Sequence, residues 1–354
     1  MSRLPAMTRV TIVSYDGEPP LGGQGVEVRG MRSALRARGH AVSTLAGRGN
    51  GAETYPRLSG RQPLDFSVHL NRHPALLQRD SPDVVHAMGG PGGVLLLRRL
   101  GTPVVYTANH TYRMAHGRGS ARRLLSPLEA RAYRRAAMVL AISSATAAAV
   151  RELGVAAARV EVLPPGVDVP ADAAPLRESP RLLFAGRWEP EKGVLDAVAV
   201  MREVVAQRAG TSAVVLGAGS LAAEVRRAAA ETPAIEVAGR VSDERLAAEY
   251  GRASIVVMPS RYEGLGLVAL EAQARGAVAV GYDVDGLRDA IASPALLVEP
   301  GDRQALLRLC LDLLDDPRRR AEAAASGLER VRARHSWDAV ARRLEEVYDA
   351  IRGA

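Results

Sequence analysis

The stretch "PPGVDVPADAAPLRESP", from Pro164 to Pro180, interrupts the chain near its middle. It holds five prolines in 17 residues, and proline fits neither the interior of a helix nor a central strand. On both sides of it, short apolar runs alternate with longer helical patterns. We therefore predict a linker at residues 166–180, between an N-terminal domain at residues 1–165 and a C-terminal domain at residues 181–335. An amphipathic helix at about residues 336–354 can pack back on the N-terminal domain.

Twelve short runs rich in β-branched and apolar residues are predicted to be strands, six before the linker and six after it. They are residues 9–14, 41–47, 83–88, 103–108, 138–143, 160–164, 181–186, 212–217, 235–239, 254–259, 277–282 and 295–300. Strands this apolar, separated by helices, are typical of parallel sheets that helices cover on both faces. The expected fold class is α/β, with two doubly wound, Rossmann-like domains facing each other across a cleft. Such sheets bind ligands beyond the carboxyl ends of their strands.

Composition indicates a cytoplasmic location. The 354 residues suit two domains. The single cysteine, Cys310, lies in an apolar helical pattern, so we predict a packing role in a reducing compartment. The first residues lack the apolar core of a signal peptide, and no run of 18 apolar residues indicates a membrane span.

Positive charge is concentrated in the first half of the chain. Residues 1–170 carry a net charge of +11, and residues 171–354 carry −3. Residues 113–137 alone hold seven arginines and one glutamate. A solvated helix face is the first interpretation of this run; an acidic acceptor, or an anionic membrane at the inner face, is the alternative. Nucleic acid is not expected, because aromatic residues are only 4% of the chain and no binding motif occurs.

Three glycines, Gly22, Gly23 and Gly25, lie between the first predicted strand and the first predicted helix. Glycine there lets backbone N–H groups approach a phosphate at a helix N-terminus. A tight turn explains the motif equally well. Its spacing is not the G-x-G-x-x-G of dinucleotide-binding folds, which argues against a nicotinamide-dependent oxidoreductase.

The stretch "GRWEPEKGV" follows the first strand of the second half and contains Lys192, the only lysine beside 46 arginines. Arg187 precedes it by five residues. A guanidinium can grip two phosphate oxygens, and an ammonium can neutralise a third. We therefore predict a diphosphate contact here, with a surface loop carrying two cations as the alternative.

A second pair of charges, Glu263 and Glu271, brackets the segment "GLGLVAL". The backbone from Gly264 to Leu267 offers consecutive N–H donors as it enters a helix, which favours an anion. Glu271, one turn into that helix, can accept hydrogen bonds from two ribose hydroxyls. Glu263 can bind a sugar hydroxyl or stabilise positive charge at a sugar carbon. An ordinary amphipathic helix is the alternative.

With these motifs, the chain resembles the retaining glycosyltransferases of family 4, which have the GT-B fold. The resemblance runs nearly end to end. It covers "GGQG" (22–25), "MRSALRARGHAVSTL" (31–45), "AISSATAAAVRELGV" (141–155), "RVEVLPPGVD" (159–168), "FAGRWEPEKG" (184–193), "VLGAG" (215–219) and residues 239–276. Its most specific part is the R-x4-K-G stretch combined with the E-x7-E segment.

The resemblance implies a hexosyl transfer from a nucleotide-diphosphate sugar to a small-molecule, saccharide or lipid-linked acceptor, with no metal and no further cofactor. It implies that Arg187 and Lys192 hold the diphosphate, that Glu271 binds the ribose, and that Glu263 contacts the transferred sugar. The other implied contacts are Gly23 with the diphosphate, Arg240 and Val241 with the base, the backbone of Gly264, Leu265, Gly266 and Leu267 with sugar and phosphates, and His110 with the sugar. His86 is expected to be structural or to line the cleft.

One segment departs from the family pattern. A Gly-Gly-x-Pro-Glu stretch is often found where this chain has "GYDVDGLRDAI", which leaves the sugar undefined. Asp283 and Asp285 there form D-x-D, which binds metals in another glycosyltransferase fold, and we interpret them as loop residues. A sugar-nucleotide 2-epimerase of the same fold remains the alternative function, and an oxidoreductase the alternative from another class.

Overall fold

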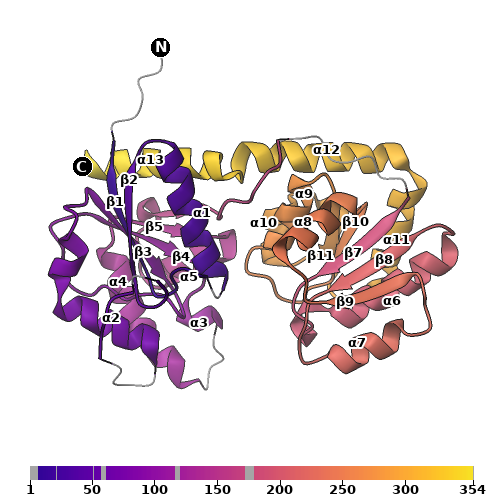
Figure 1. Cartoon of the computed structure of the whole chain (residues 1–354), viewed down its shortest axis with the longest axis horizontal. Helices are drawn as coiled ribbons and strands as arrows, with labels where there is room; N and C mark the ends of the chain where they lie inside the picture. The colour runs from indigo at the N-terminus through magenta and orange to yellow at the C-terminus, as the bar shows by residue number, and fades with distance from the viewer. Residues whose placement is uncertain are drawn as a thin grey trace, which may run out of the picture. The chain divides into compact units, whose positions relative to one another are not determined.

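The computed structural model describes residues 7–20, 22–50, 52–56, 61–115, 120–171 and 179–353. The chain forms two compact units (Figure 1). The N-terminal unit comprises Met1–Gly166 together with Trp337–Ala354, and the C-terminal unit comprises Val167–Ser336. Residues 172–178 of the predicted linker and residues 116–119 of the arginine-rich segment lie outside the described residues.

The N-terminal unit contains a parallel sheet of six strands in the order β2-β1-β3-β4-β5-β6. The strands are β1 Arg9–Ser14, β2 Ala41–Ala46, β3 Val84–Gly89, β4 Val104–Ala108, β5 Met138–Ala141 and β6 Val160–Val162. The helices are α1 Gly23–Ala37, α2 Gln62–Arg72, α3 Tyr112–Ala115, α4 Ser126–Arg135, α5 Ser144–Glu152 and α13 Trp337–Arg352. Short 3-10 helices cover Pro74–Gln78, Ala121–Leu125 and Ala157–Arg159.

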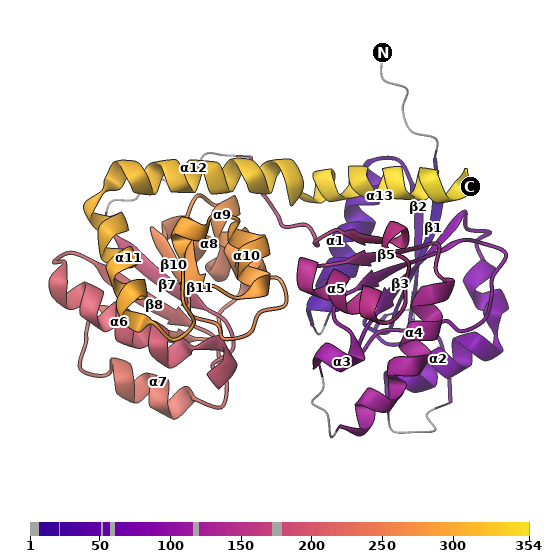
Figure 2. The ribbon, with the colours of Figure 1, turned by 180° about the vertical axis from the view of Figure 1, so that it is seen from behind.

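Two apolar clusters cover the two faces of this sheet. On one face, α1 and α13 lie against β1 and β3, with Leu35 and Leu344 fully or almost fully buried (Figure 1). On the other face, α2, α4 and α5 cover the sheet, with Phe66 and Tyr133 at 0% exposure (Figure 2). Burial on both faces explains why the strands are almost continuously apolar.

The last helix, α13, completes the N-terminal unit. Its Trp337 fits against Gly30 of α1 so closely that a Cβ atom on Gly30 would lie 2.0 Å from the indole ring. Arg38 donates to both oxygens of Glu345, at 2.7 and 2.9 Å, and His40 Nε2 lies 2.8 Å from the same carboxylate. The helix is therefore held by close packing of Trp337 at its first turn and by the partly buried Arg38–Glu345 ion pair further along.

A buried histidine also joins the sheet to α13. His86 Nδ1 lies 2.6 Å from the Tyr348 hydroxyl, and Nε2 lies 2.7 Å from the Thr107 hydroxyl. Both ring nitrogens thus have partners at 0% exposure. Burial lowers the pKa of His86 to about 3, so the ring is neutral and structural.

We expect this histidine to make stability fall in acid. Unfolded His86 takes up a proton near pH 6.5, whereas the folded side chain resists protonation down to about pH 3, so lowering the pH favours the unfolded chain over that window. Between about pH 7.5 and about pH 5, the thermal midpoint of the wild type should therefore fall relative to that of His86→Asn. His335, whose pKa burial lowers to about 4, acts in the same direction in both proteins, and Glu27 and Glu129, whose pKa burial raises to about 7, act in the opposite direction in both. An equal slope in the variant would contradict this role.

The C-terminal unit contains a second parallel sheet, in the order β12-β11-β10-β7-β8-β9. The strands are β7 Arg181–Ala185, β8 Ser212–Leu216, β9 Ile235–Gly239, β10 Ile255–Met258, β11 Val278–Tyr282 and β12 Leu297–Val298. The helices are α6 Val194–Gln207, α7 Ala222–Ala229, α8 Asp243–Arg252, α9 Leu267–Ala274, α10 Asp285–Ile291, α11 Arg303–Asp315 and α12 Pro317–Arg334. Pro190–Lys192 and Pro294–Leu296 form 3-10 helices.

The strand order changes direction between β7 and β10: β8 and β9 follow on the side of β7, and β11 and β12 follow on the side of β10. Ligands of doubly wound sheets bind at such a point, beyond the carboxyl ends of the strands. All twelve predicted strands are present, and the α/β class is confirmed. The last is shortened to two residues, because Pro294 starts a 3-10 helix where a strand was expected.

Cys310 is fully buried in α11, and burial raises the pKa of its thiol to about 12. It packs as an apolar side chain, as its sequence pattern indicated. None of the helices in the described part of the chain is long and apolar enough to cross a membrane.

Candidate functional site

A cavity of about 320 Å³ opens at the carboxyl ends of the strands in the C-terminal unit. Four of the predicted residues line it: Arg187, Arg240, Val241 and Glu271. They come from the loops after β7 and β9 and from α9. The remaining predicted residues of this unit do not line it. Lys192 follows Arg187 in the loop after β7, and the segment Glu263–Leu267 leads into α9, whose Val268 and Glu271 line the cavity.

These two loops, distant in sequence, are bound to each other. Lys192 Nζ lies 2.7 and 2.9 Å from the two oxygens of Glu263. The backbone N–H of Arg261 donates to the carbonyl of Glu191 at 2.8 Å. The R-x4-K-G stretch and the start of the E-x7-E segment therefore form one structure.

Gly193 makes this approach possible. Its φ is +66°, and a Cβ atom on it would lie 2.0 Å from the carbonyl oxygen of Pro259, at the end of β10. Any other residue here would meet both the left-handed backbone conformation and a backbone clash. This geometry explains why a glycine directly follows Lys192.

The turn after β8 packs on the Arg187 loop in a similar way. A Cβ atom on Gly217 would lie 1.8 Å from the carbonyl oxygen of Gly186, and one on Gly219 would lie 2.4 Å from that of Trp188. Trp188 is almost fully buried and donates its indole N–H to the Leu216 carbonyl at 3.2 Å. Arg187 is thus presented from a rigid backbone even though its own side chain is 65% exposed.

Arg187 has an exchangeable partner. Its guanidinium lies 2.9 Å from Glu191, four residues later, and both side chains are exposed. An exposed pair of this kind contributes only about 0.2–1 kcal/mol. Breaking it costs little, so the guanidinium can bind another anion.

Glu271 is held by a tyrosine that the sequence reasoning missed. The Tyr250 hydroxyl donates to Glu271 Oε2 at 2.9 Å, and Tyr250 itself is 2% exposed and lines the cavity. Burial raises the pKa of Glu271 above its ordinary value. Arg275 lies over the Tyr250 ring at 5.9 Å. The only sequence signal for Tyr250 is an aromatic side chain in the alanine-rich helix "LAAEYGRAS".

The loop of Glu263 rests on α10. A Cβ atom on Gly286 would lie 2.4 Å from the Glu263 carbonyl oxygen, so α10 touches the loop backbone directly. Gly266, the N-cap of α9, has φ +79° and faces Leu287 of α10. The loop therefore takes its position from the stretch that departs from the family pattern.

Asp283 and Asp285 bind an arginine from the same stretch. Arg288 Nε lies 2.5 Å from Asp283 Oδ1, and its Nη1 lies 3.0 Å from Asp285 Oδ1. Asp283 is a loop residue, as expected, whereas Asp285 is the first residue of α10, so the expectation is wrong for Asp285. One guanidinium holds both carboxylates. Within the residues that the structure describes, no group of three His, Cys, Asp or Glu side chains is placed to hold a metal ion.

Two predicted site residues belong to the N-terminal unit. Gly23 is the first residue of α1, and no atom lies within 4 Å of a Cβ placed there. His110 follows β4, with Nδ1 in contact with the Asn109 carbonyl. Their approach to the donor remains a prediction.

Gly25 requires a correction. It lies inside α1, not before it, and a Cβ atom on it would lie 2.6 Å from Asp16 Oδ2. That carboxylate also accepts the N–H of Gly22 at 3.1 Å. Gly25 is therefore needed for packing of the preceding loop on the helix.

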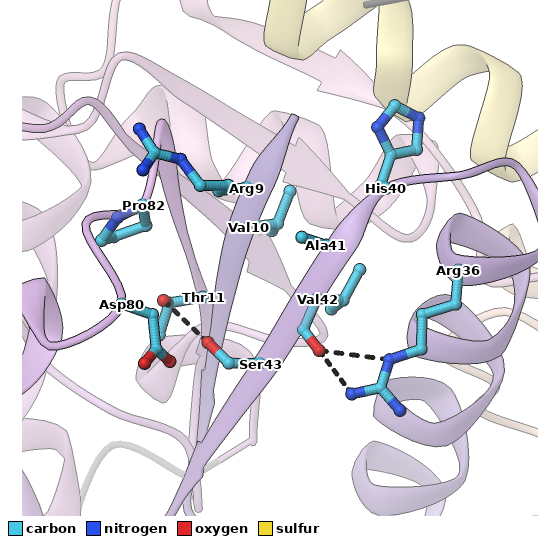
Figure 3. A pocket seen from close by; sticks show the side chains of 10 residues that line it. All are labelled: Arg9, Val10, Thr11, Arg36, His40, Ala41, Val42, Ser43, Asp80 and Pro82. Atoms are coloured by element: carbon cyan, nitrogen blue, oxygen red, sulfur yellow. Dashed lines mark hydrogen bonds between the residues drawn. The ribbon is translucent and has the colours of Figure 1, made fainter. Parts of the chain in front are cut away.

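A second hollow, of about 390 Å³, lies in the N-terminal unit at the amino ends of β1 and β2, opposite the end that carries His110 (Figure 3). Thr11 and Ser43 share a hydrogen bond of 3.1 Å there, and Arg36 donates to the Val42 carbonyl of the edge strand. None of the predicted site residues lines it.

Comparison with known proteins identifies the family. A model described as Glycosyltransferase Family 4 matches residues 21–170, and one described as Glycosyl transferases group 1 matches residues 179–316. The 2-deoxystreptamine N-acetyl-D-glucosaminyltransferase of Streptomyces fradiae is 33% identical over 75% of this chain and 70% of its own. The chain belongs to glycosyltransferase family 4.

Further comparisons agree with this. The D-inositol 3-phosphate glycosyltransferase of Thermobispora bispora is 32% identical to this protein, over 81% of this chain and 75% of the relative's own chain. The structure of sucrose-phosphate synthase from Thermosynechococcus elongatus has 22% identity and a TM-score of 0.74, covering 97% of this chain and 99% of that one. The GT-B fold predicted from the sequence is confirmed.

Proposed function

We propose that this glycosyltransferase moves a hexosyl-type sugar from a nucleotide-diphosphate sugar to an acceptor hydroxyl, with retention of configuration and without a metal ion. The observation that carries the proposal is the cavity of the C-terminal unit. It presents Arg187 and Glu271, and the Lys192–Glu263 pair joins the loop that carries Arg187 to the loop that leads into α9. Two cations, buttressed by glycine-dependent backbone contacts, can neutralise a leaving diphosphate in the place of a metal.

Each chemical group of the donor has a proposed binding partner in the chain. Arg187 and Lys192 bind the diphosphate, and the backbone N–H groups of Gly264–Leu267 assist at the N-terminus of α9. Glu271 accepts from the ribose hydroxyls, and Arg240 and Val241 lie against the base. When the diphosphate binds Lys192, the ion pair with Glu263 breaks, and Glu263 can then contact the transferred sugar. His110 reaches the sugar from the N-terminal unit.

In the proposed reaction, the bond between the anomeric carbon and the diphosphate oxygen breaks and leaves an oxocarbenium-like sugar. The acceptor oxygen bonds to the anomeric carbon on the same face, and the departing diphosphate takes the acceptor proton. Negative charge grows on the diphosphate during this step, so Arg187 and Lys192 stabilise the transition state more than the bound donor.

A thermal-shift panel of uridine, guanosine and adenosine diphosphates, with their glucose and mannose conjugates, tests the donor assignment. A ligand that binds the folded protein raises its melting temperature by mass action. We expect one nucleoside diphosphate family to do so, and EDTA to leave both the shift and the turnover unchanged. No shift with any member would overturn the proposal.

The same panel, followed by product analysis, separates the alternatives. A sugar-nucleotide 2-epimerase would convert the donor into a changed sugar nucleotide without an acceptor. A nicotinamide-dependent oxidoreductase would be stabilised by NAD and not by the diphosphates.

Tyr250→Phe tests the ribose assignment. The change leaves one oxygen of a partly buried carboxylate without its donor, which removes about 1–3 kcal/mol of interaction. We expect the Glu271 carboxylate to lose its fixed orientation and the KM for the donor to rise by roughly tenfold. Tyr348→Phe, which removes a buried hydroxyl that contacts His86 in the N-terminal unit, is the matched control and should leave KM unchanged. Equal KM values in the two variants would contradict the role of Glu271.

The acceptor is proposed to be a small polyhydroxylated molecule, a saccharide or a lipid-linked sugar. The names of the two relatives specify 2-deoxystreptamine and D-inositol 3-phosphate, which supports the first of these. The acceptor remains to be found by adding such compounds to the donor that the panel identifies.

The arginine-rich segment has apolar side chains among its cations. Leu124 is 78% exposed and Leu128 is 37% exposed, one helical turn apart, and Arg131 of α4 is exposed near them in the sequence. This supports the proposed contact with an anionic membrane surface. Co-sedimentation with phosphatidylglycerol vesicles should occur at low salt and disappear at high salt. Absence of binding at low salt would leave a solvated surface as the explanation.

A further inference from the structure

The loop Asn109–Tyr112, which follows β4 and carries His110, is held by two buried carboxyl groups from two different helices. Glu27 belongs to α1 and is 5% exposed, and Glu129 belongs to α4 and is 0% exposed. Neither residue is used by the proposed function. Both contact the loop within two residues of His110.

Glu129 is the single acid of the arginine-rich segment 113–137. Its two oxygens accept the backbone N–H of Tyr112, at 3.0 and 3.3 Å. Arg113, next along the chain, favours the ionised form of this carboxyl, but burial outweighs it and raises the pKa of Glu129 to about 7. The acid in this cationic stretch therefore points inward and holds the backbone beyond His110.

Glu27 holds the loop on the other side. The Asn109 side-chain amide donates to Glu27 Oε2 at 2.8 Å. Burial raises the pKa of Glu27 to about 7 as well. Behind the loop, a Cβ atom on Gly90 would lie 2.4 Å from the His110 carbonyl oxygen. The backbone on both sides of His110 is thus fixed by close contacts with α1, α4 and the turn after β3.

We propose that Glu27 and Glu129 are positioning residues that hold His110 in the orientation required for sugar transfer. The inference rests on the proposed function, in which His110 reaches the transferred sugar. A buried carboxyl group is a costly way to satisfy one N–H, because glutamine offers an acceptor without an ionisable group. What Glu129 adds is geometry: both its oxygens lie near the Tyr112 N–H, an arrangement that fixes the loop more tightly than a single amide oxygen would.

Hydrogen exchange of the Tyr112 amide, measured by mass spectrometry, tests the contact directly. We expect exchange at least tenfold faster in Glu129→Ala than in the wild type, and close to wild type in Glu129→Gln, because the amide oxygen restores one acceptor. Exchange in β4 should be unchanged. Glu152→Ala, at an exposed glutamate of α5 in the same unit, is the control and should match the wild type. Unchanged Tyr112 exchange in Glu129→Ala would overturn the proposal.

Turnover tests the consequence. With UDP-glucose or GDP-mannose, whichever shifts the wild-type melting temperature, release of nucleoside diphosphate should fall about tenfold in kcat for Glu129→Ala and Glu27→Ala, with partial recovery in the glutamine variants. The KM for the donor should stay within about twofold, because the proposed contacts with the base, the ribose and most of the diphosphate lie in the C-terminal unit. A wild-type kcat in a folded alanine variant would overturn the proposal.

A substitute variant and the nucleotide-binding result make every outcome interpretable. Should Glu129→Ala fail to fold, Glu27→Ala carries the turnover test, since it removes a side-chain contact and leaves the backbone N–H of Tyr112 paired. If no nucleotide shifts the wild-type protein, the proposed function fails. If nucleotides bind normally and the alanine variants turn over like the wild type, only the positioning role fails.

Discussion

Replacing Lys192 by alanine is expected to lower kcat/KM by about 30-fold or more. Loss of one partner from a buried charged contact removes about 2–5 kcal/mol, and each 1.4 kcal/mol is a factor of ten in rate. The Lys192 ammonium is 20% exposed and bound to both oxygens of Glu263. The ammonium group therefore has a fixed position from which it can bind a diphosphate.

The loss should fall mainly on kcat, because the charge on the diphosphate grows as the sugar departs. Steady-state kinetics with the donor found by the thermal-shift panel measures it. Arg208→Ala, which breaks an exposed ion pair with Asp315, is the matched control and should be close to wild type. Because Lys192→Ala also leaves Glu263 without its partner, the double variant with Glu263→Gln should not recover activity. Wild-type turnover in Lys192→Ala would remove the diphosphate assignment.

Replacing Gly193 by alanine should damage both stability and activity. The left-handed conformation costs a non-glycine residue about 1–2 kcal/mol, and the added methyl group would lie 2.0 Å from the Pro259 carbonyl oxygen. We expect a total of at least about 3 kcal/mol, which lowers the melting temperature of a unit of this size by roughly 6–12 °C. Turnover of the folded fraction should fall sharply, because the loop that carries Lys192 must move away from β10.

Gly210→Ala provides the matched control. Gly210 has φ +77°, and no atom lies within 4 Å of a Cβ placed there. The same backbone strain of about 1–2 kcal/mol therefore acts without the clash, far in the sequence from either site motif. Scanning calorimetry and steady-state kinetics separate the two effects. If Gly193→Ala and Gly210→Ala had equal melting temperatures and Gly193→Ala kept its turnover, close packing on Pro259 would be dispensable.

The strands could be predicted because burial on both faces leaves an unbroken apolar run, such as "SIVVMP", that is visible in the sequence alone. Arg187, Lys192 and Glu271 could be placed near one edge of a sheet by their order after predicted strands. The contact between Lys192 and Glu263 joins residues 71 apart, and nothing in the local pattern specifies it. Only the strand order, which brings β7 beside β10, puts the two loops in reach of each other.

Other features depended on tertiary packing and were missed. Tyr250 reaches Glu271 because α8 and α9 are neighbours, whereas its sequence neighbourhood is that of an ordinary helix. Gly25 belongs to the helix and not to the loop. It is a glycine because Asp16 approaches so closely that a Cβ atom would not fit. Glu129 did carry a signal, as the one acid among seven arginines, but its inward direction needed the helix to be placed.

The placement of α13 in the N-terminal unit has a consequence for biosynthesis. The apolar residues of β1, such as Val10 and Ile12, are made before the C-terminal unit, yet one face of their core is covered by Val340 and Leu344, which are made after it. The N-terminal unit therefore cannot mature while the rest of the chain is still being translated. Its assembly has to wait for the whole C-terminal unit to be made, so a nascent chain released early would expose that unburied face to chaperones and proteases.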